Sequence, residues 1–366
     1  MSPSANAAPQ MPCSFFKLPL ELRQAIYGYL VPYGVHLNLR PDIFSLSVCV
    51  QPRPNDSFYG GERRWVDYPR GPEPIYPRRL RSSWGHHWEC EEIALGTNHT
   101  VEALRDSSMD FMLTCKKMRA DAMDFIIDVA TCHVTDLITL QFLLQSPTTL
   151  TTETWAASFK RIQVLSITLR LSLHTFAQIE QDTLNDSQDN DTTSPNWLTL
   201  CPALRKLHNL RILHIWADHT SPKTWTLVNE RAFLHPLEAL STSPNLDITA
   251  NLPKLHPRYE SPDRHYMQTT PAPPFTITRR LRQSEHAVQV KGGEFRVKSA
   301  QDFPILFEDD SDEDLEEVER RERRMWERGE DVEAKANAIS PWMHVFREPL
   351  REGVDGGLGI DEEDWE

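Results

Sequence analysis

Short strand-like segments alternate with helix-like segments along residues 132–250, and this alternation restricts the folds that the chain can adopt. The strand-like segments are rich in Ile, Leu and Val, as in IQVLSITLRL at 162–171. The segments between them have the three- and four-residue apolar spacing of helices. Strands separated by helices favour parallel β-α units. We predict strands at 132–135, 162–171, 210–216 and 246–250, helices at 136–145, 197–207 and 225–240, and a polar loop at 180–195.

Residues 15–31 (FFKLPLELRQAIYGYLV) have the pattern of an amphipathic helix. Apolar side chains recur at every fourth position and form one stripe along such a helix. Pro19 suits its first turn, and Pro32 ends it. A helix this short persists only when it docks on other protein. The stripe consists of Leu18, Leu22, Ile26 and Leu30.

Three further patterns lie between this helix and the alternating region. Segments 36–39 and 43–48 alternate apolar and polar residues and predict a β-hairpin. Residues 51–106 are predicted to be a long, mostly irregular insertion, because prolines, arginines and glycines are frequent in it. The insertion also holds three tryptophans, which indicates that part of it lies on the folded body. Apolar spacing then predicts a helix at 107–130.

The charge of the chain is concentrated at its C-terminal end. The whole sequence carries a net charge of −14, made up of −15 from residues 301–366 and +1 from residues 1–300. Glu and Arg residues four positions apart at 316–323 predict a charged helix. The acidic runs around that helix predict a disordered acidic tail. Residues 1–14, rich in Ser, Ala and Pro, are also expected to be disordered.

These patterns together predict an α+β fold. An N-terminal helix and a β-hairpin precede alternating strands and helices, which form a mixed sheet. We expect the folded domain to span residues 15–300, with the insertion at 51–106, and residues 301–366 to add the charged helix and the tail. Further short strands are predicted at 275–277, 287–290 and 294–297.

Composition limits the cellular compartments and the classes of partner that we expect for this chain. No apolar run approaches the roughly 18 residues that a membrane helix needs. The N-terminus lacks the basic start and apolar core of a secretory signal, and no pair among the six cysteines has C-x-x-C spacing. We therefore predict a cytoplasmic or nuclear protein with reduced thiols and no membrane partner. Nucleic acid is an unfavourable partner for this charge balance, and the basic clusters 78–81 and 279–282 are interpreted as solvated surface.

Motifs that carry known chemistry are missing from the sequence. There is no phosphate-binding loop, no G-x-G-x-x-G, no G-x-S-x-G and no H-E-x-x-H. Scattered Ser, His and Asp residues carry little information without a nucleophile turn. The sequence therefore assigns no catalytic residue and no cofactor-binding residue.

One cluster resembles metal ligands. Zinc needs three or four donors that converge on one point, and a second half with clear spacing is missing here, since His99 and Cys115 are distant. We therefore predict no metal ligand, and expect the cluster to be loop residues packed near Trp84 and Trp88. The cluster consists of His86, His87 and Cys90.

Two segments resemble the signatures of a family of fungal F-box-like domains of unknown function. Residues 15–30 are similar to the opening pattern LPxELRxxIYxYL, and residues 112–122 (MLTCKKMRADA) are similar to a second pattern close to LLxxCKxxRxEA. The resemblance covers 15–50 and 107–250. The matching positions are Leu18, Pro19, Glu21, Leu22, Ile26 and Leu30 in the first signature, and Cys115, Lys116, Arg119 and Ala122 in the second.

The resemblance implies a protein partner. Proper F-box proteins bind the Skp adaptor of SCF ubiquitin ligases through an LPxEL helix and the two helices after it. This sequence departs from that pattern, because a predicted hairpin follows the helix. We therefore expect the apolar stripe to pack inward, against the 107–130 helix and the sheet, with adaptor docking as the alternative. The predicted function is a non-catalytic protein–protein interaction protein; the alternatives are an SCF substrate receptor and an enzyme with an unrecognised active site.

Overall fold

The fold of this chain is taken from a computed structural model. It describes residues 14–40, 43–50, 82–96, 111–145, 159–185, 196–221, 223–290, 294–301, 303–307 and 313–339, and structural statements below concern these. The predicted disorder of the N-terminus and of the acidic tail falls on 1–13, 308–312 and 340–366, which lie outside the described residues, whereas Ser14 begins a 3-10 helix.

A seven-stranded mixed sheet forms the centre of the molecule, in the order β2-β1-β3-β4-β5-β6-β7. β1 and β2 pair antiparallel, and every other neighbouring pair is parallel. The predicted α+β fold with a hairpin followed by a mixed sheet is confirmed. The strands are β1 (Val35–Arg40), β2 (Ile43–Val48), β3 (Thr131–Val134), β4 (Val164–Leu171), β5 (Ile212–His219), β6 (Asp247–Pro253) and β7 (Thr276–Arg280), and a separate antiparallel pair consists of β8 (Gln283–Val290) and β9 (Glu294–Gln301).

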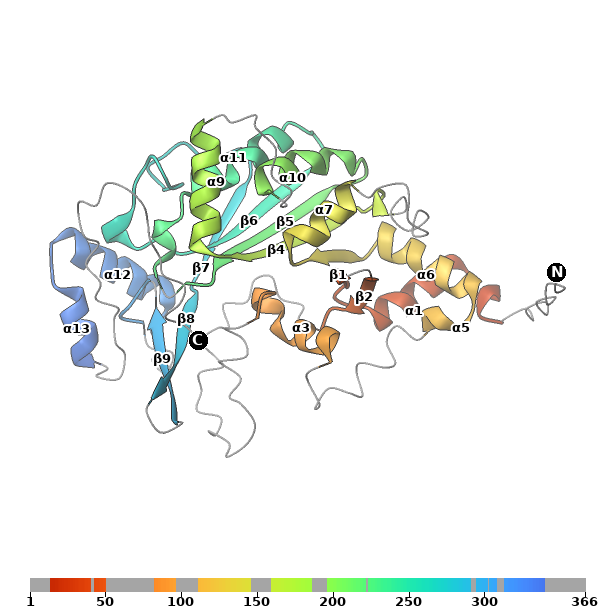
Figure 1. The fold of residues 1–366 in the computed structure, drawn as a ribbon, viewed down its shortest axis with the longest axis horizontal. Helices are drawn as coiled ribbons and strands as arrows, with labels where there is room; N and C mark the ends of the chain where they lie inside the picture. Colours follow the sequence, from red (N-terminus) through yellow and green to blue (C-terminus); the bar gives the residue numbers. More distant parts are fainter. Residues whose placement is uncertain are drawn as a thin grey trace.

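Helices connect the strands and flank both faces of the sheet. Figure 1 shows α7, α9, α10 and α11 along one side of the sheet and α3 on the other. The α-helices are α1 (Leu20–Leu30), α3 (Trp88–Leu95), α5 (Phe111–Thr114), α6 (Lys116–Asp128), α7 (Leu137–Gln145), α9 (Leu173–Asn185), α10 (Trp197–Ala203), α11 (Glu230–Leu240), α12 (Leu315–Glu327) and α13 (Val332–Ile339). The 3-10 helices are η1 (Ser14–Lys17), η4 (Gly85–His87), η5 (Leu204–Lys206), η6 (Trp225–Leu227) and η7 (Pro257–Tyr259).

The two faces of the sheet have different side chains, because successive residues of a strand point to opposite faces. On β4, Leu165, Ile167 and Leu169 are fully buried in the large apolar core that the helices cover. Burying each such side chain contributes roughly 1.5–3 kcal/mol, so burial on this face favours folding strongly. The residues between them, such as Ser166, belong to the other face, where polar and aromatic groups collect.

The first six residues of one predicted loop are helical, and the rest of that loop, 186–195, lies outside the described residues. The sequence predicted a polar loop at 180–195, whereas α9 continues to Asn185. Phe176 and Ile179 anchor α9 in the main core, and most of its other side chains are polar. None of residues 180–184 is buried, so the end of α9 has no apolar pattern that distinguishes it from a polar loop.

The predicted helix at 107–130 is interrupted at Cys115. This residue has extended backbone angles (φ −161°, ψ 160°), and its Sγ accepts a hydrogen bond from the Met118 N–H at 3.3 Å. Cys115 therefore acts as the N-cap of α6, and α5 precedes it as a separate short helix. The first four residues of the predicted helix lie outside the described residues.

Part of the predicted insertion at 51–106 is folded onto the sheet, as its tryptophans indicated. Residues 82–96 form η4 and α3, and Trp84 and Trp88 are buried. Gly85 allows this segment to approach the sheet closely, since a Cβ at this position would lie 2.5 Å from the Trp216 ring of β5. Residues 51–81 and 97–106 lie outside the described part of the chain.

The charged helix predicted near residue 316 is α12, and it is docked rather than isolated. Val318 and Met325 pack with Ile305 and Val332 in a small second core. Lys254 forms an ion pair with Glu319, and the Arg323 guanidinium lies 2.7 Å from a carboxylate oxygen of Glu260. No helix within the described ranges is both long and apolar enough to cross a membrane.

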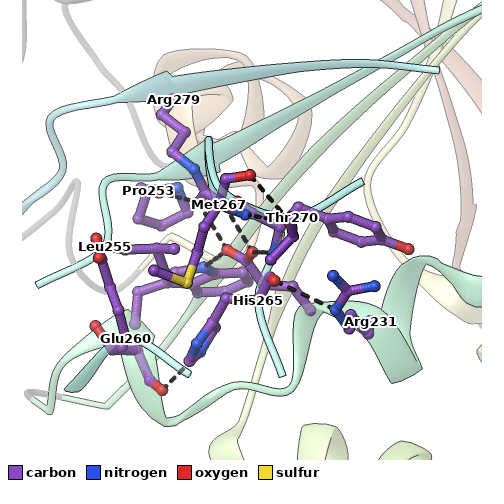
Figure 2. Close-up of polar contacts among 12 residues, drawn as sticks. Arg231, Pro253, Leu255, Glu260, His265, Met267, Thr270 and Arg279 are labelled. Atoms are coloured by element: carbon purple, nitrogen blue, oxygen red, sulfur yellow. Dashed lines mark hydrogen bonds and ion pairs between the residues drawn. The ribbon is translucent and has the colours of Figure 1, made fainter. Parts of the chain in front are cut away.

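The basic cluster 279–282 was interpreted as solvated surface, and this is wrong for its two end residues. Arg282 is 4% exposed, and its guanidinium lies over the Trp216 ring at 4.6 Å from the centroid. Arg279 donates to both carboxylate oxygens of the buried Glu230, at 2.8 and 2.7 Å. Figure 2 shows Arg279 beside Pro253, whose carbonyl accepts another of its hydrogen bonds at 3.0 Å. Both guanidiniums are therefore structural.

Candidate functional site

Helix α1 is held to the body by a polar and aromatic anchor. Tyr27 is 1% exposed, and its hydroxyl donates to an Asp121 carboxylate oxygen of α6 at 2.8 Å. Arg23, one turn earlier, forms an ion pair with the same carboxylate. The Tyr27 ring also packs against Phe111 and Phe125, with centroids 5.6 and 5.7 Å away. This anchor decides which face of α1 points inward.

The predicted apolar stripe faces outward instead. Leu22 is 53% exposed and Ile26 is 39% exposed, while Leu18 and Leu30 are half-buried. The expectation that the stripe packs against the 107–130 helix and the sheet is therefore wrong for its two central residues. The physical reason is that Arg23, Tyr27 and Val31, themselves four residues apart, make the inward contacts.

The exposed face of α1 is apolar along its length. Leu22, Ile26 and Tyr29 are spaced by four and three residues and share this face, and Tyr29 is 85% exposed. Leu20 and Tyr33 are also exposed. We call Leu22, Ile26 and Tyr29 the α1 outer face. Exposed large apolar groups concentrated on one helix are a feature of interaction surfaces.

The remaining residues of the first signature also lie at the surface end of α1. Pro19 is the exposed N-cap position of the helix, with φ −53° and ψ 153°. Glu21 is exposed in the first turn, where a carboxylate interacts favourably with the helix dipole. Four of the six signature residues thus lie on α1, Leu18 and Pro19 directly precede it, and the hairpin β1–β2 follows it rather than two more helices.

The second signature is structural at two of its four positions. Cys115 caps α6, and Ala122 is fully buried in the main core. Lys116 and Arg119 are exposed on the same helix. The Asp121 anchor of α1 lies beside Ala122, so the two signatures meet where α1 packs on α6.

A second candidate site lies on the opposite face of the sheet from the main core, where four buried His and Cys side chains converge. His36 comes from β1, Cys49 directly follows β2, His87 ends η4, and Cys90 is in the first turn of α3. All four are at most 1% exposed. Their potential ligand atoms all lie within 4.8 Å of one another. We call these residues the His-Cys cluster.

The contacts within the His-Cys cluster are short. His87 Nδ1 lies 3.6 Å from Cys49 Sγ and 3.9 Å from Cys90 Sγ, and the two sulfurs are 3.9 Å apart. The Val50 N–H donates to Cys90 Sγ at 3.3 Å. Neither ring nitrogen of His36 has a hydrogen-bond partner among the described residues, and the same holds for His87 Nε2.

Burial and neighbouring rings determine the electrostatics of the His-Cys cluster. Desolvation holds the pKa of His36 and of His87 well below the ordinary histidine value, with smaller effects from nearby histidines. Both imidazoles are therefore neutral at pH 7. The His36 ring is stacked between Trp84 and His133, with centroids 4.8 and 4.9 Å away. Ring orientation is thus restricted by packing.

Sequence reasoning found half of this site. His87 and Cys90 belong to the cluster, but the neighbouring His86 packs toward the Trp216 ring at 4.9 Å instead. His36 and Cys49 were missed. The signal that could have found them is the hairpin, because its register pairs Val35 with Val48 and so places both residues at its open end. Of the distant candidates, Cys115 caps α6 and His99 lies outside the described residues.

The fold and these sites define an α+β domain with helices on both faces of a mixed sheet and an N-terminal helix whose outer face is apolar and exposed. The chain belongs to the family described as Domain of unknown function (DUF7730), whose model matches residues 8–265. The matched range includes α1, the His-Cys cluster and strands β1–β6. The predicted membership of an uncharacterised domain family is confirmed at this level. No curated protein and no solved structure matches the chain.

Proposed function

We propose that the chain is a non-catalytic interaction protein that binds a protein partner through the α1 outer face. The observation that carries the proposal is that Leu22, Ile26 and Tyr29 share one helix face and are 53%, 39% and 85% exposed. Burying a fully exposed apolar side chain of this size contributes roughly 1.5–3 kcal/mol, and a partner would recover the part of it that corresponds to the exposed fraction of each side chain. The helix is already anchored through Tyr27, so binding needs little ordering of α1.

The partner that the α1 outer face fits best is a protein with an apolar groove that receives one helix face. The likeness of 15–30 to F-box-like signatures makes a Skp-type adaptor of an SCF ubiquitin ligase the specific version of this proposal. The hairpin β1–β2 occupies the place in the chain where F-box proteins have two further helices. We therefore propose contact through α1 alone, in the cytoplasm or nucleus, where such adaptors act.

Affinity purification of the full chain tests the general proposal. We expect Leu22→Asp to remove the bound partner, because truncating or charging an apolar anchor at an interface costs about 2 kcal/mol or more, roughly 30-fold in affinity. The matched control is Leu184→Asp. Leu184 is 76% exposed and lies on α9, which does not contribute to the α1 outer face. Thermal unfolding should be unchanged in both variants. Equal recovery of the same proteins with both variants would refute the proposal.

Calorimetric titration of the purified chain with a Skp-type adaptor tests the specific version. Binding that Leu22→Asp abolishes and Leu184→Asp preserves would support the substrate-receptor role. An adaptor that does not bind, while another partner is lost from Leu22→Asp in the purification, would remove that role and leave the interaction proposal standing.

A further inference from the structure

We propose that His36, Cys49, His87 and Cys90 bind one structural zinc ion. This inference is independent of the α1 outer face, because the His-Cys cluster lies on other elements and is buried. It rests on donor geometry, on buried polar atoms without partners and on the chemistry of the donor set.

The distances match the edges of a zinc tetrahedron. Zn–S bonds of about 2.3 Å and Zn–N bonds of about 2.0–2.1 Å place two sulfurs about 3.8 Å apart and a sulfur and a nitrogen about 3.6 Å apart. The corresponding separations here are 3.9 Å between Cys49 Sγ and Cys90 Sγ, and 3.6 and 3.9 Å from these sulfurs to His87 Nδ1. With His36 inside the same 4.8 Å limit, an ion could be accommodated by small shifts of the side chains.

A bound cation would account for the surroundings of two buried side chains, His36 and Cys90. His36 is fully buried, and neither of its ring nitrogens has a hydrogen-bond partner within the described chain. A buried polar group without a partner costs roughly 1–3 kcal/mol, which coordination of one nitrogen would offset. The Val50 N–H that donates to Cys90 Sγ is the kind of contact that supports a metal-bound thiolate.

The donor set selects the metal and its role. Two sulfurs and two imidazoles suit zinc, whereas magnesium and calcium require oxygen ligands. Four protein donors fill a tetrahedral coordination sphere, so no position remains for a substrate or a reactive water. The site is therefore structural.

The ion would join two parts of the chain that are distant in sequence. His36 and Cys49 belong to the hairpin at one edge of the sheet, and His87 and Cys90 belong to the 82–96 segment that lies over it. Because the ligands of the unfolded chain are scattered, the binding free energy of the ion becomes stability of the folded state. Zinc would thus hold the folded part of the 51–106 insertion on the sheet.

Elemental analysis of the untagged full chain, purified under reducing conditions and dialysed against zinc, tests this site. We expect one zinc per chain, and loss of that zinc in Cys90→Ser. The matched control is Cys115→Ser, because a serine hydroxyl can replace the Cys115 cap of α6. We expect this variant to keep one zinc. A wild-type chain without stoichiometric zinc, or a Cys90→Ser chain that retains it, would overturn the proposal.

Cobalt substitution keeps the test valid if Cys90→Ser does not fold. The wild-type chain loaded with Co²⁺ should show the visible bands of tetrahedral cobalt together with sulfur-to-cobalt charge transfer, and excess Zn²⁺ should abolish both. An octahedral spectrum, or no sulfur charge transfer, would contradict the site. So would a Cys49–Cys90 disulfide, detected by mass spectrometry in the protein isolated under reducing conditions.

Discussion

At the scale of single residues, Glu230 shows how the fold accommodates a buried carboxylate. It is fully buried, and it accepts hydrogen bonds from Trp225 Nε1 at 2.7 Å and from the Tyr266 N–H at 3.3 Å, besides the two from Arg279. A charge removed from water is tolerated only when its partners replace the lost hydration. Glu230 therefore ties α11 to β7 and to the 254–275 connection.

We expect Glu230→Gln to destabilise the fold strongly. The amide keeps the shape of the side chain but turns one donor toward the Arg279 guanidinium, which leaves that cation without its counter-charge. Breaking a buried pair in this way costs about 3–5 kcal/mol. Urea unfolding followed by circular dichroism measures the difference.

The control for this substitution is Asp128→Asn, which removes a surface pair. Arg161 and Asp128 are 2.6 Å apart, with side chains 45% and 36% exposed. Exposed pairs contribute about 0–1 kcal/mol. Equal losses of stability in Glu230→Gln and Asp128→Asn would show that the Glu230–Arg279 pair does not stabilise the fold more than a surface pair does.

At the scale of elements, helix orientation depends on a few contacts that amphipathic spacing does not rank. Helix α1 has two faces with large apolar or aromatic side chains. The face that contains Tyr27 packs inward, because there Tyr27 and Arg23 also form a hydrogen bond and an ion pair with Asp121. The 3-10 helix η4 depends on a different feature, since the glycine at its start permits contact with β5. Gly85 has φ +55°, and the Trp216 ring leaves no room for a Cβ there.

Gly85→Ala should displace η4 and α3 from the sheet. The added Cβ would lie 2.5 Å from a ring carbon of Trp216, in a left-handed backbone conformation that favours glycine. We expect faster limited proteolysis within 82–96 and a change in tryptophan fluorescence. Gly329→Ala is the matched control, because Gly329 has φ +71° and an added Cβ there would meet nothing within 4 Å. Its substitution should cost only about 1 kcal/mol. Similar proteolysis of both variants would argue against the close approach of η4 to Trp216.

At the scale of the whole molecule, the described residues form a large core around the seven-stranded sheet and a second small core that includes α12 and α13. His256 lies at their junction, where its ring contacts Tyr259 and Trp326 at 5.1 and 4.8 Å between centroids. Burial, reinforced by Arg258 and Arg323, lowers the pKa of His256 to about 4. The junction is thus built around a neutral imidazole.

Acid should therefore weaken this junction. The pKa of His256 is about 4 in the folded state, and a histidine in the unfolded chain has a pKa of about 6.5. Between these values the unfolded state binds more protons, so this contribution to stability is present above about pH 6.5 and is lost as the pH falls toward 4. Between about pH 7 and 4.5 the loss from this residue should be about 2–3 kcal/mol.

His256→Asn isolates this contribution. The Arg258 N–H donates a hydrogen bond to His256 Nδ1 at 3.2 Å. Asparagine can accept the same hydrogen bond, but its side chain does not titrate. Urea unfolding at about pH 7 and about pH 4.5 should show a smaller loss for the variant than for the wild type. An identical pH dependence of the two proteins would contradict a low pKa for His256.

Much of the fold follows from local patterns, whereas the candidate sites do so only in part. The hairpin, the strands from β3 to β6 and the helices between them all have the apolar period of their element. The α1 helix was also predicted, but not the direction of its stripe, because Asp121 is 94 residues away from Tyr27. His36 and Cys49 were not predicted as members of the His-Cys cluster for the same reason, since Cys49 and Cys90 are 41 residues apart in the sequence.

What the sequence alone determined is the class of fold, the order of its elements and the family signatures, because apolar periodicity and turn residues act over a few positions. What only the tertiary structure decided is which groups meet. It turned Leu22 and Ile26 toward solvent, buried Arg282, paired Arg279 with Glu230, and brought two pairs of His and Cys side chains from separate segments into one cluster. Contacts of this kind depend on how distant segments pack together, and no local pattern carries that information.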